Sequence, residues 1–252
     1  MATPVLELPG GPYRALLLDL DGVLTDTASL HVRAWKTVFD AFLAGWASAH
    51  QVDEPPFDPK GDYEAYVDGR PRADGIRAFL AARGIVPPEG GPDDPPDTGT
   101  VTGLARAKNA RFLALLERHG VHVFPGSLAL LRAAAAGGLA RAVVTSSANG
   151  RRVLAAAGLE HECDLVVDGN DLVRSGLRGK PAPDTYLHAA RRLEVAPPEA
   201  VVVEDAPAGV EAGRSGGFGL VVGVDRVGDA QELRAAGAGL VVVDLGELLV
   251  PQ

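Results

Sequence analysis

Short runs of apolar residues recur along the chain, and each ends in polar residues. They cover residues 15–18, 142–145, 165–167, 200–203, 219–222 and 240–243. Continuous apolar runs of this length are typical of strands in a parallel sheet that is covered on both faces. Helical patterns lie between most of them, at 127–136, 150–157, 185–193 and 210–214. This alternation predicts an α/β fold with a doubly wound parallel sheet, whose ligands bind beyond the carboxyl ends of the strands.

The pattern changes between residues 29 and 121, where strands give way to helices. Apolar periodicity predicts helices at 29–46, 73–83 and 104–119. Two interruptions, 53–62 and 87–102, are rich in Pro, Gly and Asp and are expected to be irregular loops. We therefore predict a core formed by 1–28 and 121–252, with 29–120 inserted after the first strand as a helical cap.

Charge and composition narrow the class of protein. The formal net charge of -9 argues against nucleic acid or an anionic membrane as a partner, although a metal and a few cations can still bind a phosphate. No segment approaches the roughly 20 apolar residues that span a bilayer, and the first residues do not resemble a signal peptide. Cys163 is the single cysteine, which excludes an internal disulfide. We expect a soluble, cytoplasmic monomer.

The strongest chemical signal is Asp19-Leu-Asp21-Gly, directly after the first apolar run. Two carboxylates two residues apart point to the same side at the end of a strand. One can attack phosphorus while the other transfers a proton. A divalent cation is then needed beside a phosphate, and Mg²⁺ suits an all-oxygen site. The alternative is a simple acidic turn.

Polar groups at two later positions suit phosphate binding. Thr145-Ser146-Ser147 follows the second predicted strand and precedes a helix, so its hydroxyl and N–H groups form a natural phosphate cradle. An ordinary helix cap is the alternative. Lys180, in Gly-Lys-Pro-Ala-Pro-Asp, can neutralise phosphate charge and hold Asp19 ionised, whereas most loop lysines are simply solvated.

An acidic pair, Glu204-Asp205, ends the apolar run at 200–203. Acidic residues at this point can complete a magnesium site. The alternative is that they cap a helix beginning at Pro207.

The order of these four motifs resembles the haloacid dehalogenase superfamily. The resemblance implies a Rossmann-like core with an inserted helical cap. It implies that Asp19 is the nucleophile that forms an aspartyl phosphate and that Asp21 is the general acid and base, with Thr145 and Lys180 completing the catalytic set. Mg²⁺ would be bound by Asp19, the backbone carbonyl of Asp21 and Asp205, with Glu204 close by.

The segment from Thr25 to Lys36 is similar to the β-phosphoglucomutase family. This resemblance implies that Thr27 and His31 lie in the hinge between core and cap, and that His31 couples cap closure to Asp21. It implies that Arg72, or alternatively Arg70, binds the phosphate remote from the reaction. The other substrate contacts that it implies come from Lys108-Asn109 in the cap and from Ser146, Ser147 and Asn149 in the core.

The implied reaction is a mutase reaction. Phosphorylated Asp19 would donate to β-glucose 1-phosphate, and the resulting β-glucose 1,6-bisphosphate would return its other phosphate and release glucose 6-phosphate. The main alternative is a sugar phosphatase with the same core residues. A non-catalytic sensor is disfavoured because every core polar residue is present. Leu30 stands before His31 where an aromatic is usual, and the loops at 53–62 and 87–102 are long, so the sugar is not defined.

Overall fold

The computed structural model describes residues 4–96 and 98–251, and the chain folds into two compact units. The core unit comprises Met1–Asp26 and Val121–Gln252, and the helical unit comprises Thr27–Gly120. The first boundary was expected two residues later, after residue 28. It falls earlier because Thr27 is already the N-cap of the first helix of the helical unit.

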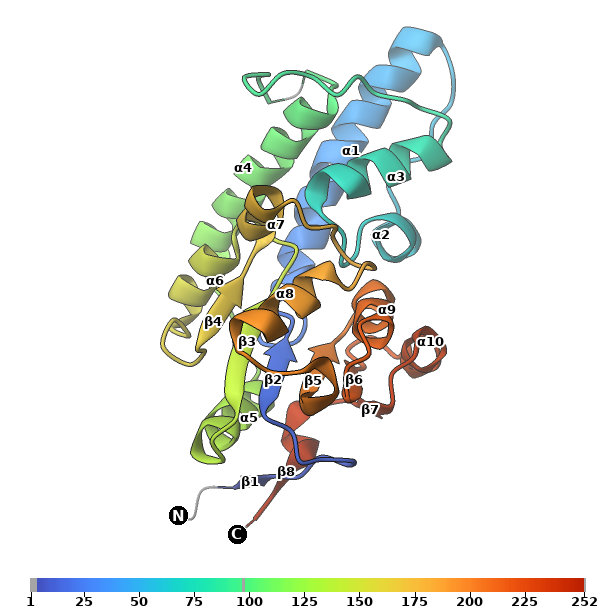
Figure 1. Cartoon of the computed structure of the whole chain (residues 1–252). Coiled ribbons are helices and arrows are strands. Elements are labelled where there is room, and N and C mark those ends of the chain that lie inside the picture. The colour runs from blue at the N-terminus through green and yellow to red at the C-terminus, as the bar shows by residue number, and fades with distance from the viewer. Residues whose placement is uncertain (1–3, 97, 252) are drawn as a thin grey trace. The chain divides into compact units, whose positions relative to one another are not determined.

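Within the described residues, the core unit contains a parallel sheet of six strands in the order β4-β3-β2-β5-β6-β7 (Figure 1). The strands are β2 (Ala15–Leu18), β3 (Ala140–Val144), β4 (Leu165–Val167), β5 (Ala200–Glu204), β6 (Leu220–Val224) and β7 (Leu240–Val242). Each predicted apolar run overlaps one of them, so the predicted α/β class with a parallel sheet is confirmed. A further antiparallel pair, β1 (Val5–Leu6) with β8 (Leu249–Val250), joins the two ends of the described chain. Two-residue strands have no periodicity, so the sequence did not indicate this pair.

Strand β2 lies in the middle of the parallel sheet and sets the position of Asp19. It pairs with β3 on one side and β5 on the other, with Leu18 opposite Val143 and Val203. The N–H of Asp19 donates to the carbonyl of Val203 at 3.0 Å. Asp19 is therefore held at the carboxyl edge of the sheet. The chain adds β3 and β4 on one side of β2 and β5, β6 and β7 on the other. Ligands bind at such a switch point in open α/β sheets.

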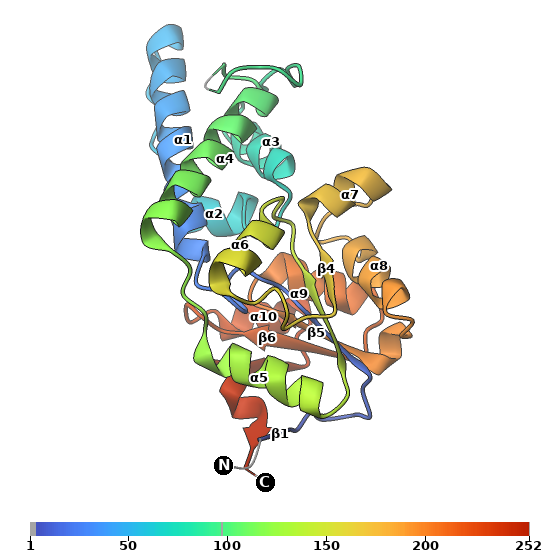
Figure 2. The same cartoon turned by 90° about the vertical axis from the view of Figure 1, so that its left-hand side faces the viewer.

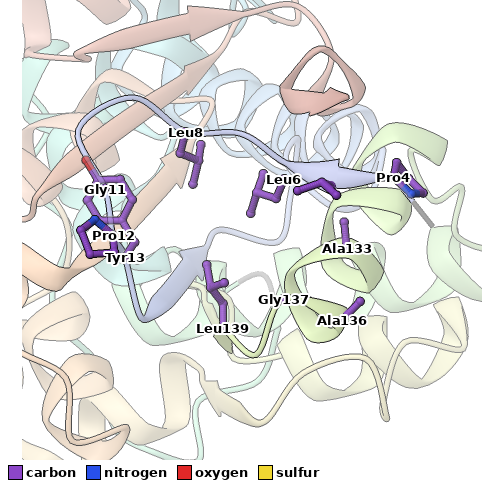
Figure 3. Close-up of a pocket in the computed structure, with 11 residues that line it drawn as sticks. Pro4, Leu6, Leu8, Gly11, Pro12, Tyr13, Ala133, Ala136, Gly137 and Leu139 are labelled. Carbon is purple, nitrogen blue, oxygen red and sulfur yellow. The ribbon is translucent and has the colours of Figure 1, made fainter. Parts of the chain in front are cut away.

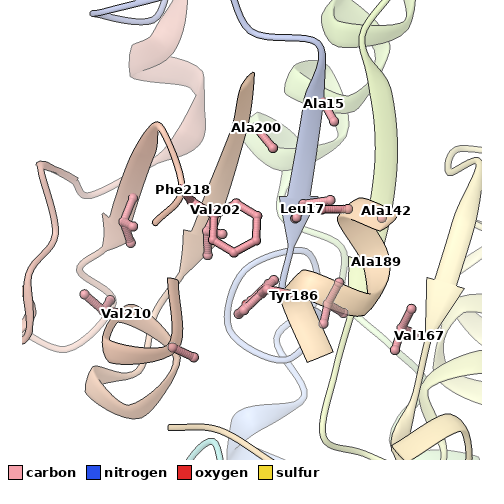
Figure 4. Close-up of a cluster of buried hydrophobic side chains, with 14 of the residues drawn as sticks. Ala15, Leu17, Ala142, Val167, Tyr186, Ala189, Ala200, Val202, Val210 and Phe218 are labelled. Carbon is pink, nitrogen blue, oxygen red and sulfur yellow. The ribbon is translucent and has the colours of Figure 1, made fainter. Parts of the chain in front are cut away.

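Helices cover both faces of the sheet. They are α5 (Pro125–Ala136), α6 (Gly150–Ala157), α7 (Gly169–Ser175), α8 (Asp184–Arg192), α9 (Pro207–Ser215) and α10 (Ala230–Ala236), with short 3₁₀ turns η1 (Pro197–Glu199) and η2 (Leu245–Leu248). Tyr186 and Ala189 of α8 and Val210 of α9 pack against the strand residues that point to one face, as Figure 4 shows. Helix α5 lies on the opposite face (Figure 2).

Two of these helices, α7 and α10, were not expected from the sequence. Each has seven residues, too few for a clear apolar period. Helix α7 is stabilised locally, because Asp168 accepts the N–H of Asp171 while the Asp171 carboxylate accepts the N–H of Asp168. Helices α5 and α9 also begin earlier than predicted, each at a proline in the first turn, a position that proline favours.

The helical unit consists of α1 (Ala28–His50), α2 (Gly61–Tyr66), α3 (Arg72–Ala82) and α4 (Val101–His119). Its core is aromatic, and Phe39, Phe57 and Phe79 are fully buried in it. Helix α1 continues four residues past its predicted end at Trp46, because its last turn is exposed and carries no apolar signal. The predicted loops 53–62 and 87–102 are shortened by the starts of α2 and α4; Asp97 lies outside the described residues. Among the residues that the structure describes, no helix has both the length and the apolar character that crossing a bilayer requires.

A cavity of about 450 Å³ lies between the N-terminal segment and α5. Leu6 and Leu8 lie on one side of it and Leu139 on the other (Figure 3). Tyr13, which also lines it, precedes the start of β2. The cavity is therefore at the amino end of that strand, away from the edge that carries Asp19.

Candidate active site

Asp19 and Lys180 form a buried ion pair at the end of β2. Asp19 is 8% exposed and Lys180 3%. The Lys180 ammonium contacts Asp19 Oδ1, lies 2.6 Å from Glu204 Oε1 and donates to the carbonyl of Val144 at 3.1 Å. Residues 161 positions apart in the sequence thus meet in one place, as the motif order indicated.

The carboxylates of Asp19, Glu204 and Asp205 gather around this lysine. Each offers an oxygen that lies within 4.8 Å of the others. Lys180 supplies one positive charge against three carboxylates, and such an excess of buried negative charge is costly unless a cation balances it. Carboxylate oxygens are the ligands that Mg²⁺ prefers. The donor set therefore fits a divalent cation of this kind.

The electrostatics of the cluster follow from burial and crowding. Burial raises the pKa of Asp19 to about 8; Lys180 opposes this rise, while Glu204 and Asp21 add to it. Burial disfavours the charge on Lys180, but Asp19 and Glu204 outweigh burial and raise its pKa above the ordinary value. Lys180 therefore stays positively charged. Its single charge does not balance the three carboxylates around it.

Tyr186 belongs to this cluster, although the sequence analysis did not identify it. Its hydroxyl donates to Glu204 Oε1 at 2.7 Å, and the Lys180 ammonium lies 5.0 Å from its ring centroid. Burial, with Glu204 beside it, raises the pKa of Tyr186 well above its usual value, so it stays a donor. Tyr186 lies on the apolar face of α8, so its sequence pattern is that of an ordinary core residue. Its position six residues after Lys180 was the one feature that could have linked it to the site.

Glu204 is not a helix cap. Its Oε2 accepts the N–H groups of Asp205 and Ala206, at 3.2 and 3.4 Å, while α9 begins after Ala206 without a side-chain cap. Gly209, in the first turn of α9, approaches so closely that a Cβ there would lie 1.8 Å from Glu204 Oε1. Gly209 therefore packs closely against a buried carboxylate, a role that no local pattern in the sequence indicates.

The loop after Asp19 is a tight turn that returns to its own start. The N–H of Gly22 donates to the carbonyl of Thr25 at 2.7 Å, and the Thr25 hydroxyl donates to the carbonyl of Leu20 at 3.2 Å. Gly22 has φ +86°, and a Cβ there would lie 1.7 Å from Asp205 Oδ2. This close approach brings the Asp19–Asp21 segment against the acidic pair at the end of β5.

The predicted phosphate loop follows β3, beside Asp19. Thr145 is buried, and its hydroxyl oxygen accepts the N–H of Ser147 at 3.1 Å. The hydroxyl oxygen of Ser147 accepts the N–H of Asn149 at 3.2 Å, and Asn149 is the N-cap of α6. These N–H groups bond within the loop, so phosphate binding by Thr145, Ser146 and their neighbours stays a prediction.

The predicted cap residues lie in the helical unit. His31 of α1 contacts Lys108 of α4, whose ammonium lies 5.1 Å from the Trp35 ring centroid. Arg72, the first residue of α3, donates to Asn109 Oδ1 at 2.9 Å. Two pairs, His31–Lys108 and Arg72–Asn109, are thus joined through neighbouring residues of α4.

Thr27 is buried at the N-cap of α1. The substrate contacts of these residues, and the choice between Arg70 and Arg72, stay predictions.

Comparison with known proteins agrees with this geometry. Residues 13–217 match the model of the haloacid dehalogenase-like hydrolase family. The chain belongs to that family. The expectation drawn from the motif order is therefore confirmed.

Within the haloacid dehalogenase-like family, the chain is 52% identical over 248 residues to a β-phosphoglucomutase of Mycobacterium bovis, covering 97% of this chain and 94% of that protein. The crystal structure of a β-phosphoglucomutase from Clostridium difficile superposes with a TM-score of 0.73 at 26% identity, covering 94% and 93% of the two chains. A CbbY variant from Rhodobacter sphaeroides in complex with xylulose-(1,5)-bisphosphate gives a TM-score of 0.69 at 26% identity, covering 94% and 96%. The chain is thus an enzyme of this family and is similar to phosphomutases.

Proposed function

We propose that this chain interconverts β-D-glucose 1-phosphate and glucose 6-phosphate through an aspartyl phosphate and β-glucose 1,6-bisphosphate. The observation that carries the proposal is the 52% identity to a β-phosphoglucomutase over 97% of this chain. The buried Asp19–Lys180 pair beside Glu204 and Asp205 supports it with the groups that phosphoryl transfer needs.

Asp19 is the nucleophile in this proposal. In the first step, the 6-hydroxyl of β-glucose 1-phosphate attacks the phosphorus on phosphorylated Asp19, and the P–O bond to the carboxylate breaks. After the bisphosphate has reoriented, Asp19 attacks the other phosphorus, and glucose 6-phosphate leaves. Lys180 neutralises charge on the carboxylate in both steps, a role supported by its contact with Asp19 Oδ1.

Asp21 transfers the proton. It accepts the proton of the attacking 6-hydroxyl and later returns it to the 1-oxygen as that oxygen leaves. Its position two residues after Asp19, in the turn closed by Gly22 and Thr25, supports this role. Thr145 and Ser146 would bind the transferring phosphate from the neighbouring strand end.

Asp19, Asp205 and the carbonyl of Asp21 would hold Mg²⁺, with Glu204 beside them. The ion would neutralise charge on the phosphoryl oxygens, which otherwise repel an attacking carboxylate. The clustering of Asp19, Glu204 and Asp205 supports this assignment.

A mutase must also bind the second phosphate of its bisphosphate. We assign Arg72 and Lys108 to that phosphate and to the sugar, with Ser147 and Asn149 contributing from the core unit. Thr27 and His31 would form the hinge. The bisphosphate in the CbbY complex supports a substrate with two phosphates. The proposed enzyme is cytoplasmic and monomeric, and size-exclusion chromatography tests its oligomeric state.

A coupled assay tests the proposed activity. The purified chain is given β-glucose 1-phosphate, Mg²⁺ and a trace of the bisphosphate, and both glucose 6-phosphate and inorganic phosphate are measured. We expect glucose 6-phosphate without stoichiometric phosphate release, no conversion of the α anomer, and a loss of at least about 10³-fold in kcat for Asp19→Asn, the scale seen when a nucleophile is removed. Release of inorganic phosphate as the main product would instead identify a phosphatase.

A further inference from the structure

Arg226, which follows β6, contacts the catalytic loop from a distant part of the chain. Its Nε donates to the carbonyl of Gly22 at 2.8 Å, and its Nη2 lies 3.4 Å from the carbonyl of Val23. Its Nη1 donates to the carbonyl of Val243 at 3.1 Å and lies 3.6 Å from Asp244 Oδ2. One guanidinium thus joins the loop after Asp19 to the end of β7.

The side chain is fixed on its remaining face as well. Its guanidinium carbon lies 3.7 Å from the ring centroid of Phe124, and the side chain is 17% exposed. The backbone around it is also held, because the Asp225 carboxylate accepts the N–H groups of Gly228 and Asp229 at 2.7 and 2.8 Å. A planar fork held in this way loses little further entropy when it bonds to carbonyls.

Arg226 contacts both segments through which the chain passes between the core and helical units. On the core side of each passage, it bonds to Gly22 and Val23 in one segment and stacks on Phe124 in the other. The N–H of Phe124 donates to the carbonyl of Leu24 at 3.1 Å, and Thr25 bridges to Val123. The Ser127 hydroxyl donates to the carbonyl of Val23 at 2.6 Å. Arg226 therefore stacks on one of two paired segments and bonds to the other.

The consequence for the reaction follows from Gly22. Its carbonyl is held by Arg226, its φ is +86°, and its Cα approaches Asp205 so closely that a Cβ would lie 1.7 Å from Oδ2. Asp21 is the preceding residue. Loss of the bond from Arg226 would leave the peptide after Gly22 free to rotate, which would disturb the backbone next to Asp21 and the close approach of Gly22 to Asp205.

We propose that Arg226 is a positioning residue that holds the Asp19–Thr25 loop in the geometry needed for Mg²⁺ binding and phosphoryl transfer. The inference deepens the proposed function and rests on it for the reaction, but not for the metal. Partners that orient a metal site in this way typically change metal affinity or activity 10–100-fold when they are removed.

The test compares Arg226→Met with Arg226→Lys and with a matched arginine far from the loop. Arg141, in β3, is similarly buried at 14% exposed and pairs with Asp164 at 2.8 Å. Methionine keeps an apolar side chain against Phe124 but removes the donors, and lysine restores one charged donor. Two readouts are measured on the full chain: kcat and KM for β-glucose 1-phosphate, and the Mg²⁺ concentration that gives half of the maximal thermal stabilisation.

We expect Arg226→Met to lower kcat about 10–100-fold and to raise the half-saturating Mg²⁺ concentration about tenfold, with KM changed less than about threefold. Arg226→Lys should fall between this variant and the unaltered chain. Arg141→Met should lower the melting temperature while leaving kcat and Mg²⁺ dependence within about twofold.

An Arg226→Met protein with unaltered kcat and Mg²⁺ dependence would overturn the inference. If that variant does not fold, unaltered values in folded Arg226→Lys would overturn it equally. Weakened Mg²⁺ binding in Arg226→Met, in a chain that does not isomerise β-glucose 1-phosphate, would uphold the inference and refute the proposed function alone.

Discussion

At the scale of single residues, the charged and polar groups of the site offset the cost of their burial by bonding to one another. Glu204 is 1% exposed, yet it contacts Lys180, accepts from the Tyr186 hydroxyl and accepts two backbone N–H groups. A buried carboxylate is tolerated only when its oxygens are bonded in this way. Each partner of Glu204 therefore contributes to stability as well as to the site.

Replacing Tyr186 by Phe removes one of these partners without changing the packing of the ring. We expect the free energy of unfolding to fall by about 1.5–3 kcal/mol, because the lost hydrogen bond is to a charged group. Urea unfolding measures this. Tyr13→Phe is the control, since Tyr13 donates to Pro9 at an exposed position, and it should cost less than about 0.5 kcal/mol. Equal losses in the two variants would contradict the argument.

Gly209 and Gly45 form a second matched pair, since both lie within helices. A Cβ at Gly209 would collide with Glu204, whereas a Cβ at Gly45 meets nothing within 4 Å. Gly45→Ala should therefore stabilise the chain by about 1 kcal/mol, the helix-propensity gain. Gly209→Ala should instead destabilise it and reduce kcat by displacing Glu204. Thermal unfolding and the coupled assay decide the matter, and a stabilising Gly209→Ala would refute it.

At the scale of elements, the long loop before α4 is ordered by its own polar groups. The Thr100 hydroxyl accepts the N–H of Gly103 at 3.0 Å, which caps α4. The same hydroxyl donates to Asp94 at 2.6 Å, which closes the loop. Arg77 of α3 bonds to Glu89 at the start of the same loop. A segment rich in Pro and Gly is thereby attached to two helices of the helical unit.

Replacing Thr100 by Ala removes both bonds at the start of α4. We expect a loss of about 1 kcal/mol in the free energy of unfolding, the usual value for a helix N-cap. Thr37→Ala serves as the comparison, because Thr37 lies inside α1 and donates to the carbonyl of Arg33, four residues earlier. That change should be nearly neutral. Urea unfolding of the two variants tests the difference, and a neutral Thr100→Ala would show that the cap is not what holds the loop.

At the scale of the whole molecule, the excess of carboxylates couples metal binding to folding. Mg²⁺ that binds the folded chain alone should raise the free energy of unfolding by about 2.7 kcal/mol at 100 times its dissociation constant. Unfolding by urea with and without Mg²⁺ measures this gain. Asp205→Asn should abolish most of it, while Asp164→Asn, at a half-exposed carboxylate paired with Arg141, should retain it. A full gain in Asp205→Asn would place the metal elsewhere.

Much of this molecule was predictable from local signals. An apolar run followed by Asp19-Leu-Asp21-Gly indicates a strand end with two carboxylates, because strand formation and side-chain alternation depend on neighbouring residues. The resemblance carried by the order of the later motifs then implied that Lys180 and Glu204-Asp205 would join them. Their gathering was confirmed; their chemical roles stay predictions.

Other features were decided only by the tertiary structure. The packing of α8, α9 and the loop after β6 against the sheet brings three residues to the site, Tyr186, Gly209 and Arg226. Local sequence periodicity does not predict that packing. The short pair β1 and β8 likewise exists only because both ends of the described chain meet. The physical reason is the same in each case: these residues act through partners that are distant in sequence, and only packing brings the partners together.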